Sequence, residues 1–182
     1  MTLTRHNISK KFVLCAPDSK MVAAWHKYFD SDDRFEINQS TVLRSDVDAW
    51  STASDSHMGM GGGLDRAIAQ RLPGIDRIAR KFIAELYHGF MPVGQAAVIP
   101  SGYSLPQWLI LVPTMPYPTV LESEEPIYLA TMAFLNVVYK HPSILRVSVP
   151  AYGTGVGRVP PDKAAAAMYQ AVVTYDQQVH RD

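Results

Sequence analysis

Residues 54–72 read Ser-Asp-Ser-His-Met-Gly-Met-Gly-Gly-Gly-Leu-Asp-Arg-Ala-Ile-Ala-Gln-Arg-Leu, a glycine-rich loop that runs into a helical pattern. Glycine has no side chain to pack and loses the most backbone entropy on folding, so the four glycines at 59 and 61–63 do not serve a core. Apolar residues follow at helical spacing at positions 64, 68 and 72. A glycine-rich loop that opens a helix presents unpaired N–H groups and the positive end of the helix dipole. This stretch therefore predicts an anion site.

A second glycine-rich stretch, Gly-Thr-Gly-Val-Gly at 153–157, also follows a predicted strand and precedes a predicted helix. In an open α/β sheet, ligands collect at the carboxyl ends of the strands, so we expect the two loops to face one crevice. The competing interpretation is that each loop is only a tight turn, but the shared topological position favours a ligand. Neither loop fits the G-x-G-x-x-G or the G-x-x-x-x-G-K-[ST] motif, which argues against an ordinary NAD-dependent dehydrogenase or P-loop NTPase.

The rest of the chain predicts strands that alternate with helices. Strands are expected at 11–16, 35–37, 47–50, 92–100, 108–112 and 144–149, and helices at 19–29, 64–71, 75–87, 126–139 and 163–179. Asp18 or Ser19 is the expected cap of the first helix, and Asp162 that of the last. The pattern predicts a three-layer α/β/α sandwich around a mixed, mostly parallel sheet. We expect one domain over residues 1–182, with its core at about 11–179.

Composition limits the classes of partner. Lys plus Arg equals Asp plus Glu at 17 each, so no broad nucleic-acid surface and no adsorption to anionic lipid is expected. The single cysteine, Cys15, excludes an internal disulfide and a cysteine-based metal cluster, and its apolar neighbours indicate a buried core thiol. No histidines stand at metal-ligand spacing, so no metal is expected. The chain shows no apolar signal segment and no bilayer-spanning run, which favours a cytoplasmic protein.

With both loops in view, the chain resembles the macro domain family. Residues 47–55 and 61–68 are similar to that family's first loop and helix start, and Val-Pro-Ala-Tyr-Gly-Thr-Gly-Val-Gly at 149–157 is similar to its second loop. Residues 91–96 and 112–115 look like pieces of a bacterial branch of the family. The resemblance runs from about residue 12 to 173, nearly the whole chain. It implies a macro-domain fold that binds ADP-ribose, with no further cofactor, and in some members hydrolysis of ADP-ribose from proteins or nucleic acids.

The resemblance also implies a set of ligand-binding residues. It places the diphosphate on the second loop and the distal ribose against the glycines of the first, and we add the flanking residues Ser54, Ser56 and Tyr152 to the predicted site. For Tyr152, lining the crevice and packing beneath the loop are both open. The loop residues in this set are Gly61, Gly62, Gly63, Gly153, Thr154, Gly155, Val156 and Gly157.

Two positions depart from the family pattern. Asp55 stands where many relatives carry an asparagine that touches the distal ribose, and the aspartate that commonly binds adenine is absent. The residues aligned with that aspartate are Ser40 and Thr41, so we expect adenine to be held by stacking and main chain.

Asp55 and Asp65 are the predicted catalytic residues. A carboxylate at Asp55 is suited to orienting or deprotonating a water that attacks the anomeric carbon, and to stabilising an oxocarbenium-like state. Asp65 is expected to share the ribose, and two carboxylates in one site push one pKa upward. The alternatives are that Asp65 only favours the helix dipole and that Asp55 only caps a loop. His57 is expected as a solvent-exposed loop residue.

The sequence therefore predicts a hydrolase that cleaves ADP-ribosyl linkages at C1 of the distal ribose. Its expected partner is ADP-ribose, carried by a mono-ADP-ribosylated protein or by a metabolite such as O-acetyl-ADP-ribose. The first alternative is a module that reads ADP-ribose without turnover, and the second is an interaction protein that keeps the fold and has lost the ligand.

Overall fold

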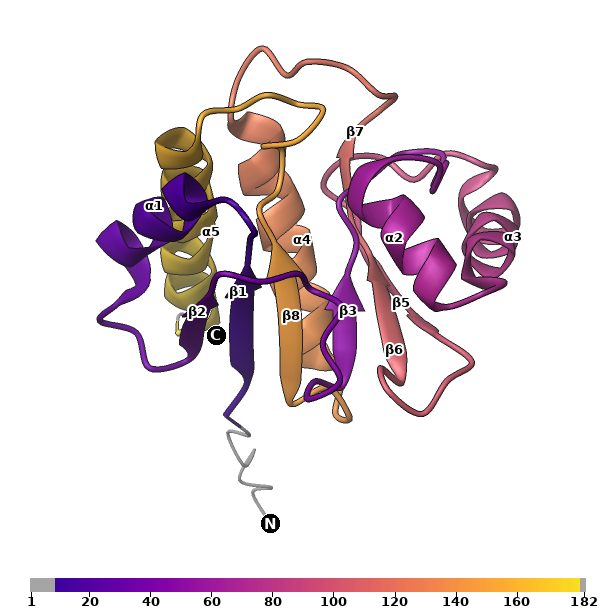
Figure 1. The fold of residues 1–182 in the computed structure, drawn as a ribbon, viewed down its shortest axis with the longest axis horizontal. Coiled ribbons are helices and arrows are strands. Elements are labelled where there is room, and N and C mark those ends of the chain that lie inside the picture. The colour runs from indigo at the N-terminus through magenta and orange to yellow at the C-terminus, as the bar shows by residue number, and fades with distance from the viewer. Residues whose placement is uncertain (1–8, 181–182) are drawn as a thin grey trace.

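A six-stranded sheet forms the centre of residues 9–180, the part of the chain that the computed structural model describes (Figure 1). Its order is β2-β1-β8-β3-β6-β5, and every pairing is parallel except the antiparallel β5–β6 pair. The strands are β1 (Lys11–Cys15), β2 (Phe35–Asn38), β3 (Ala49–Ser51), β5 (Ala97–Pro100), β6 (Trp108–Leu111) and β8 (Arg146–Pro150). The predicted mixed, mostly parallel sheet is confirmed.

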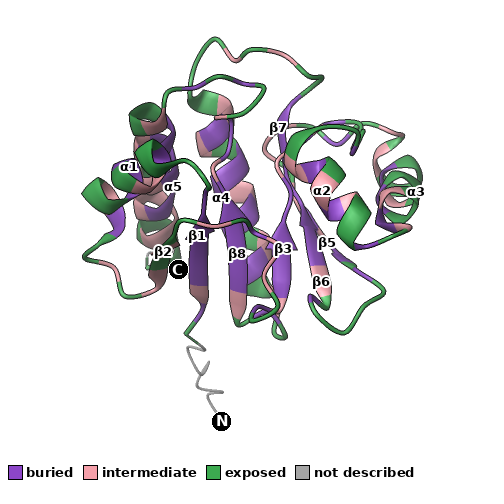
Figure 2. Cartoon of the chain, viewed as in Figure 1, coloured by how far each residue is buried: buried purple, intermediate pink, exposed green. Residues whose placement is uncertain are grey.

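Two apolar layers cover the two faces of this sheet. The helices are α1 (Ser19–Phe29), α2 (Gly63–Arg71), α3 (Ile75–Tyr87), α4 (Glu125–Lys140) and α5 (Pro161–Val179). Phe12 and Leu14 of β1 pack with α1, α4 and α5, whereas Val13 and Cys15 pack on the opposite face with α2 and α3. This alternation is what a strand buried on both faces requires, because successive side chains point to opposite faces. Figure 2 shows the strands largely buried and the outer faces of the helices exposed.

Residues 39–48, here called the strap, join β2 to β3 without helix or strand structure. Figure 1 shows the strap passing across β1 and β8 on its way to β3. Two residues of the predicted strand 47–50 therefore belong to the strap, and β3 begins only at Ala49.

Two short strands beyond β3 and β6 were not predicted. β4 (Ser54–Asp55) and β7 (Pro113–Met115) pair in parallel, with a shift of register between Ser54 and Asp55. Between β3 and β4, the Thr52 hydroxyl accepts a hydrogen bond from the N–H of Val112 at 3.0 Å, in place of a backbone bond between the strands. This exchange separates the β4–β7 pair from the main sheet. The pair continues β3 and β6 beyond the carboxyl ends of the strands, toward the glycine-rich loop at 59–63.

Three details of the elements correct or confirm the prediction. The strand predicted at 92–100 begins only at Ala97, because residues 92–95 form a turn in which the Gln95 N–H donates to the Pro92 carbonyl at 3.1 Å. Asp18 caps α1 by accepting a hydrogen bond from the Lys20 N–H at 3.0 Å, as expected. Asp162 does not cap α5: it lies inside the first turn and pairs with Lys27 at 2.7 Å.

Candidate functional site

A cleft of about 660 Å³ opens at the carboxyl ends of the parallel strands, and both glycine-rich loops line it. Residues 59–65 form part of its wall with β4 and β7, and residues 150–151 and 153–157 form another part. The strap and the start of α1 complete it through Thr41, Val42 and Asp18. The two loops thus converge on one space, as the topological argument requires.

The first loop presents backbone donors to this cleft. α2 begins with Gly62 as its N-cap, and the first helical bond runs from the Arg66 N–H to the Gly62 carbonyl at 3.2 Å. Within the described residues, no group accepts a hydrogen bond from the N–H groups of Gly62, Gly63, Leu64 or Asp65. These donors and the helix dipole together suit an anionic or polyhydroxyl ligand.

The second loop follows β8, and backbone hydrogen bonds within the loop hold its shape. Its carbonyls at Gly153 and Gly155 accept bonds from Val159 and Arg158 at 3.0 and 3.1 Å. Among residues 9–180, the N–H groups of Gly155, Val156 and Gly157 find no acceptor. A run of backbone amides of this kind is the usual cradle for a diphosphate.

Glycine is required at two positions of this loop. Gly153 has a φ of +74°, and a Cβ at that position would stand 2.7 Å from the Ile127 side chain. A Cβ at Gly157 would stand 2.6 Å from the Gly153 carbonyl oxygen and 3.0 Å from Leu121. The loop therefore keeps its shape because these two residues have no side chain.

We predict that Gly157→Ala lowers the free energy of unfolding by about 1–3 kcal/mol, because the added methyl forces backbone apart. Gly155→Ala is the matched control for stability, since no atom lies within 4 Å of its Cβ position. Denaturant unfolding of both variants checks this. Equal stability of the two would contradict the steric account.

Asp65 lies in the first turn of α2, is buried and lines the cleft. Burial raises its pKa to about 6, and the nearby charge of Asp55 adds a smaller increase; the Ser54 hydroxyl and the Ala53 N–H, at 3.4 Å, oppose the shift. The predicted direction is thus confirmed, but desolvation contributes more than the second carboxylate.

Asp55 follows Ser54 at the end of β4 and also lines the cleft. Its Oδ1 accepts a hydrogen bond from the His57 N–H at 2.7 Å, and the His57 ring lies 3.7 Å from the same oxygen. Oδ2 faces Gly59, where a Cβ would come within 3.3 Å of it. Asp55 therefore caps the loop with one oxygen and keeps the other beside the cleft.

The structure corrects two predicted ligand contacts. The Tyr152 side chain is fully buried beneath the second loop, where its hydroxyl lies 2.6 Å from the Ser51 hydroxyl, and it does not line the cleft. Ser56 is also fully buried, and its N–H and hydroxyl both bond to the Met115 carbonyl. Both residues shape the loops from below, because their neighbours in the chain turn toward the cleft instead.

Ser54 differs from these two residues. Its side chain is buried but lines the cleft, and within the described chain its hydroxyl makes no hydrogen bond of ordinary geometry. A buried hydroxyl without a partner is costly unless a ligand or water completes it. The Ser54 hydroxyl is close enough to the Asp65 carboxyl to oppose the rise in its pKa, so Ser54 supports that side chain within the cleft wall.

Several lining residues were not predicted from the sequence. They are Met60, Leu64, Thr114, Met115, Pro118 and Pro161. The similarity of residues 112–115 to the family is the one sequence signal that pointed to Thr114 and Met115. Cys15 lines the cleft too, but it is almost fully buried, and burial raises the pKa of its thiol, as befits a core residue.

Residues 9–180 contain neither a candidate metal cluster nor a candidate membrane span. No group of three His, Cys, Asp or Glu side chains is placed to hold a metal ion there. None of the helices in that range combines the length and apolarity needed to cross a bilayer.

Comparison with known proteins now decides the family. The family model described as Macro domain matches residues 52–168, a span that contains both loops. The chain belongs to the macro domain family. An uncharacterized protein of Aquifex aeolicus (strain VF5) is 30% identical to this macro domain over 141 residues, which cover 78% of this chain and 82% of that protein.

Solved structures share the fold of this macro domain. The macrodomain of Mycobacterium tuberculosis DarG superposes with a TM-score of 0.63 at 22% identity, covering 78% of this chain and 89% of that one. The Oceanobacillus iheyensis macrodomain with ADP gives a TM-score of 0.63 at 21% identity, over 76% of this chain and 74% of that one. Thermosipho africanus DarTG in complex with ADP-ribose gives 0.61 at 15% identity, over 74% of this chain and 37% of that one.

Proposed function

We propose that this macro domain binds ADP-ribose and hydrolyses its linkage to a carrier at C1 of the distal ribose. The observation that carries the proposal is the meeting, in one cleft, of two sets of free backbone amides with the carboxylates of Asp55 and Asp65. Neutral amides bind a diphosphate without a basic patch, in keeping with a chain of balanced charge. The similar folds include a macrodomain with ADP and DarTG in complex with ADP-ribose, which supports the same ligand class.

The order of the strands supports one orientation of the ligand along the cleft. The sheet order β1-β8-β3 puts the second loop, which follows β8, between the β1 end and the β3–β4 end. With the diphosphate on the second loop, the distal ribose lies toward Asp55, Asp65 and the Ser54 hydroxyl. The adenosine then lies on the other side of β8, toward Cys15 and the strap.

Hydrolysis at the Asp55 end follows from general acid–base chemistry. Oδ2 of Asp55 accepts a proton from the water that attacks C1, and the new C1–O bond forms as the bond to the carrier breaks. The positive charge that develops on the ribose is stabilised by the adjacent carboxylates. The leaving carrier oxygen or nitrogen takes a proton from solvent. We place the activity in the cytoplasm and take a mono-ADP-ribosylated protein, or an ADP-ribosyl metabolite, as its substrate.

Ligand binding is tested first, with ADP-ribose and with adenosine as the comparison that lacks the diphosphate. At 100 times its Kd, ADP-ribose is expected to add about 2.7 kcal/mol to the free energy of unfolding. That gain raises Tm by about 5–10 °C in a protein of this size. Adenosine at the same concentration is expected to give a much smaller shift. No shift and no calorimetric heat with ADP-ribose would favour an interaction protein without this ligand.

A second candidate, a reader that binds without turnover, has one observation in its favour. Oδ1 of Asp55 is already occupied by the His57 N–H, which is how a purely loop-capping aspartate behaves. Release of ADP-ribose from proteins modified through different side chains, measured beside calorimetry, separates the two functions. Tight binding without release on these linkages would favour the reader.

A further inference from the structure

One wall of the cleft has no secondary structure of its own to hold it in place. Thr41 and Val42 line the cleft from the strap, residues 39–48. Backbone hydrogen bonds join the strap to β8 and β6 only at Asp48, so the rest of the strap takes its position from side-chain contacts, which mutation can test. Most of them come from β8.

The first contact is buried. The side chain of Ser148, in the middle of β8, is fully buried, and its hydroxyl donates to the Val42 carbonyl at 2.6 Å. The Val42 side chain is buried as well and packs with Val13 and Cys15 of β1. This hydrogen bond fixes the backbone next to Thr41 on the cleft wall.

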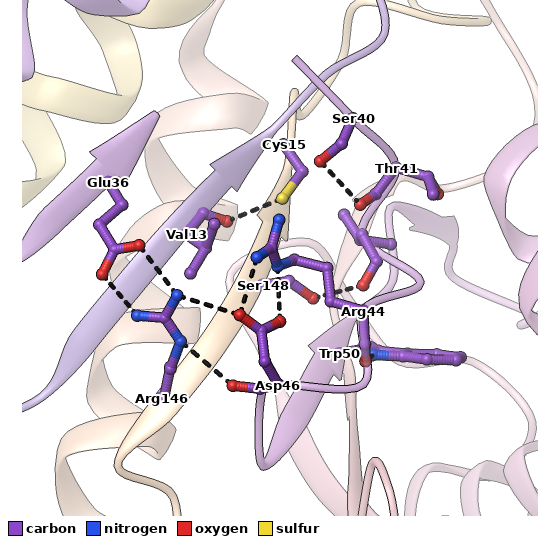
Figure 3. A network of polar contacts seen from close by, with 11 residues as sticks. Val13, Cys15, Glu36, Ser40, Thr41, Arg44, Asp46, Trp50, Arg146 and Ser148 are labelled. Atoms are coloured by element: carbon purple, nitrogen blue, oxygen red, sulfur yellow. Dashed lines mark hydrogen bonds and ion pairs between the residues drawn. The ribbon is translucent and has the colours of Figure 1, made fainter. Parts of the chain in front are cut away.

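The second contact is an ionic clamp centred on Arg146 (Figure 3). The Arg146 guanidinium binds Glu36 of β2 with both terminal nitrogens, at 2.5 and 2.8 Å. The same side chain donates to the Asp46 carbonyl at 3.1 Å and to its carboxylate at 3.3 Å. Arg146 therefore ties the strap to two strands of the sheet.

Further bonds brace the strap on either side of Asp46. Arg44 forms a bidentate pair with the Asp46 carboxylate at 2.7 and 2.8 Å, and Trp50 of β3 donates to the Arg44 carbonyl at 2.7 Å. The Arg44 guanidinium, with other contacts, lowers the pKa of Asp46 to about 2, so the clamp stays ionised at neutral pH. Asp48 accepts from the N–H groups of Leu145 and Arg146, each at 2.8 Å.

The strand that carries this clamp also carries the second glycine-rich loop. β8 ends at Pro150, and the loop that lines the cleft follows directly. Ser148 in the middle of β8 and Arg146 at its start thus tie the strap to the strand that leads into that loop. Neither Arg146 nor Ser148 lines the cleft itself.

We propose that Arg146 and Ser148 are positioning residues, which act through the strap to set the cleft width at the adenosine end of the ligand. The inference rests on the proposed function, because that function orients ADP-ribose along the cleft. The Asp55 end lies on β4 and β7, which make none of the clamp's hydrogen bonds, so we expect the clamp to affect it much less than the adenosine end. The clamp therefore governs affinity and not the chemical step.

The test compares Arg146→Met, Arg146→Lys and Asp46→Asn with Arg80→Met, which removes a remote exposed ion pair with Asp76 on α3. The Kd for ADP-ribose is expected to rise roughly 3- to 30-fold in Arg146→Met, the range for residues that act through a network. Arg146→Lys, which keeps the charge but not the bidentate geometry, is expected to recover part of the loss. Asp46→Asn, on an exposed residue, gives the same direction with little effect on folding, and Arg80→Met leaves the Kd unchanged.

In the release assay, the clamp variants are expected to raise KM and leave kcat unchanged. Unchanged Kd in both Arg146→Met and Asp46→Asn, with wild-type protein binding ADP-ribose, would overturn the inference and leave the proposed function intact. A fall in kcat equal to the rise in KM would also overturn it, because the effect would then reach the Asp55 end. Failure of the wild-type protein to bind ADP-ribose would instead overturn the proposed function.

Discussion

Asp55→Asn is expected to lower the rate of ADP-ribose release about 100-fold or more, the contribution typical of a positioned general base. Asparagine has the shape of aspartate, and its carbonyl oxygen can still accept the hydrogen bond from the His57 N–H that holds the loop. The loop, and with it the affinity for ADP-ribose, is therefore expected to survive. The Kd should change by less than about threefold, since the diphosphate cradle is untouched.

The measurement is single-turnover release of ADP-ribose from a modified substrate, with calorimetry on the same preparations. Asp76→Asn, a partly exposed carboxylate on α3, is the matched control and is expected to keep full activity. Undiminished release by Asp55→Asn would remove the base role from Asp55. Loss of binding together with release would assign this residue to holding the ligand.

Asp65→Asn is expected to make the protein more stable at pH 8, although it removes a charge from the site. Burial raises the Asp65 pKa from 3.8 to about 6 on folding, so between these values the folded state binds a proton that the unfolded state has released. Stability contributed by this group is therefore complete below the lower value, falls as the pH rises through the window and stays reduced above it. A shift of this size corresponds to about 3 kcal/mol, which asparagine does not incur.

Comparing the two proteins at two pH values shows whether the charge of Asp65 is the source of the difference in stability. Denaturant unfolding of Asp65→Asn and wild type is expected to differ by about 2–3 kcal/mol at pH 8 and by much less at pH 4. Asp76→Asn should show no such gain, staying within about 0.5 kcal/mol of wild type. In the same variant ADP-ribose is expected to bind about tenfold more weakly, because a charge-assisted bond to a ribose hydroxyl is lost. An equal stability gain at both pH values would show that the buried charge is not its source.

Much of the fold was predictable from local patterns. Helices α1 and α3 begin and end where apolar periodicity and turn residues indicated, because capping and amphipathic spacing are local properties. The same holds for the two glycine-rich loops, whose backbone needs restrict the residue type along a short stretch. Their convergence on one cleft followed from the rule that parallel strands end at one edge.

Other features depend on contacts between segments far apart in the chain. Asp162 is of a residue type that often caps helices, but α5 begins before it, and its carboxylate pairs with Lys27 instead. The Thr52 hydroxyl takes the hydrogen bond of the Val112 N–H in place of a backbone carbonyl. That exchange separates the unpredicted β4–β7 pair from β3 and β6. Contacts between residues so far apart in the sequence cannot be predicted from it, because neither residue type alone specifies its partner.

The amino-acid sequence alone determined most of the helices and strands, the two glycine-rich loops and the resemblance to the family, because turn geometry and hydrophobic periodicity depend on neighbouring residues. Only the tertiary structure decided which way side chains face: Tyr152 and Ser56 turn beneath the loops, while Ser54 and Asp65 face the cleft. It also decided that burial, more than a second carboxylate, raises the Asp65 pKa, and that Arg146 holds the strap across the sheet. Burial and ion pairing depend on contacts between residues that are far apart in the sequence, and a local sequence pattern does not contain those contacts.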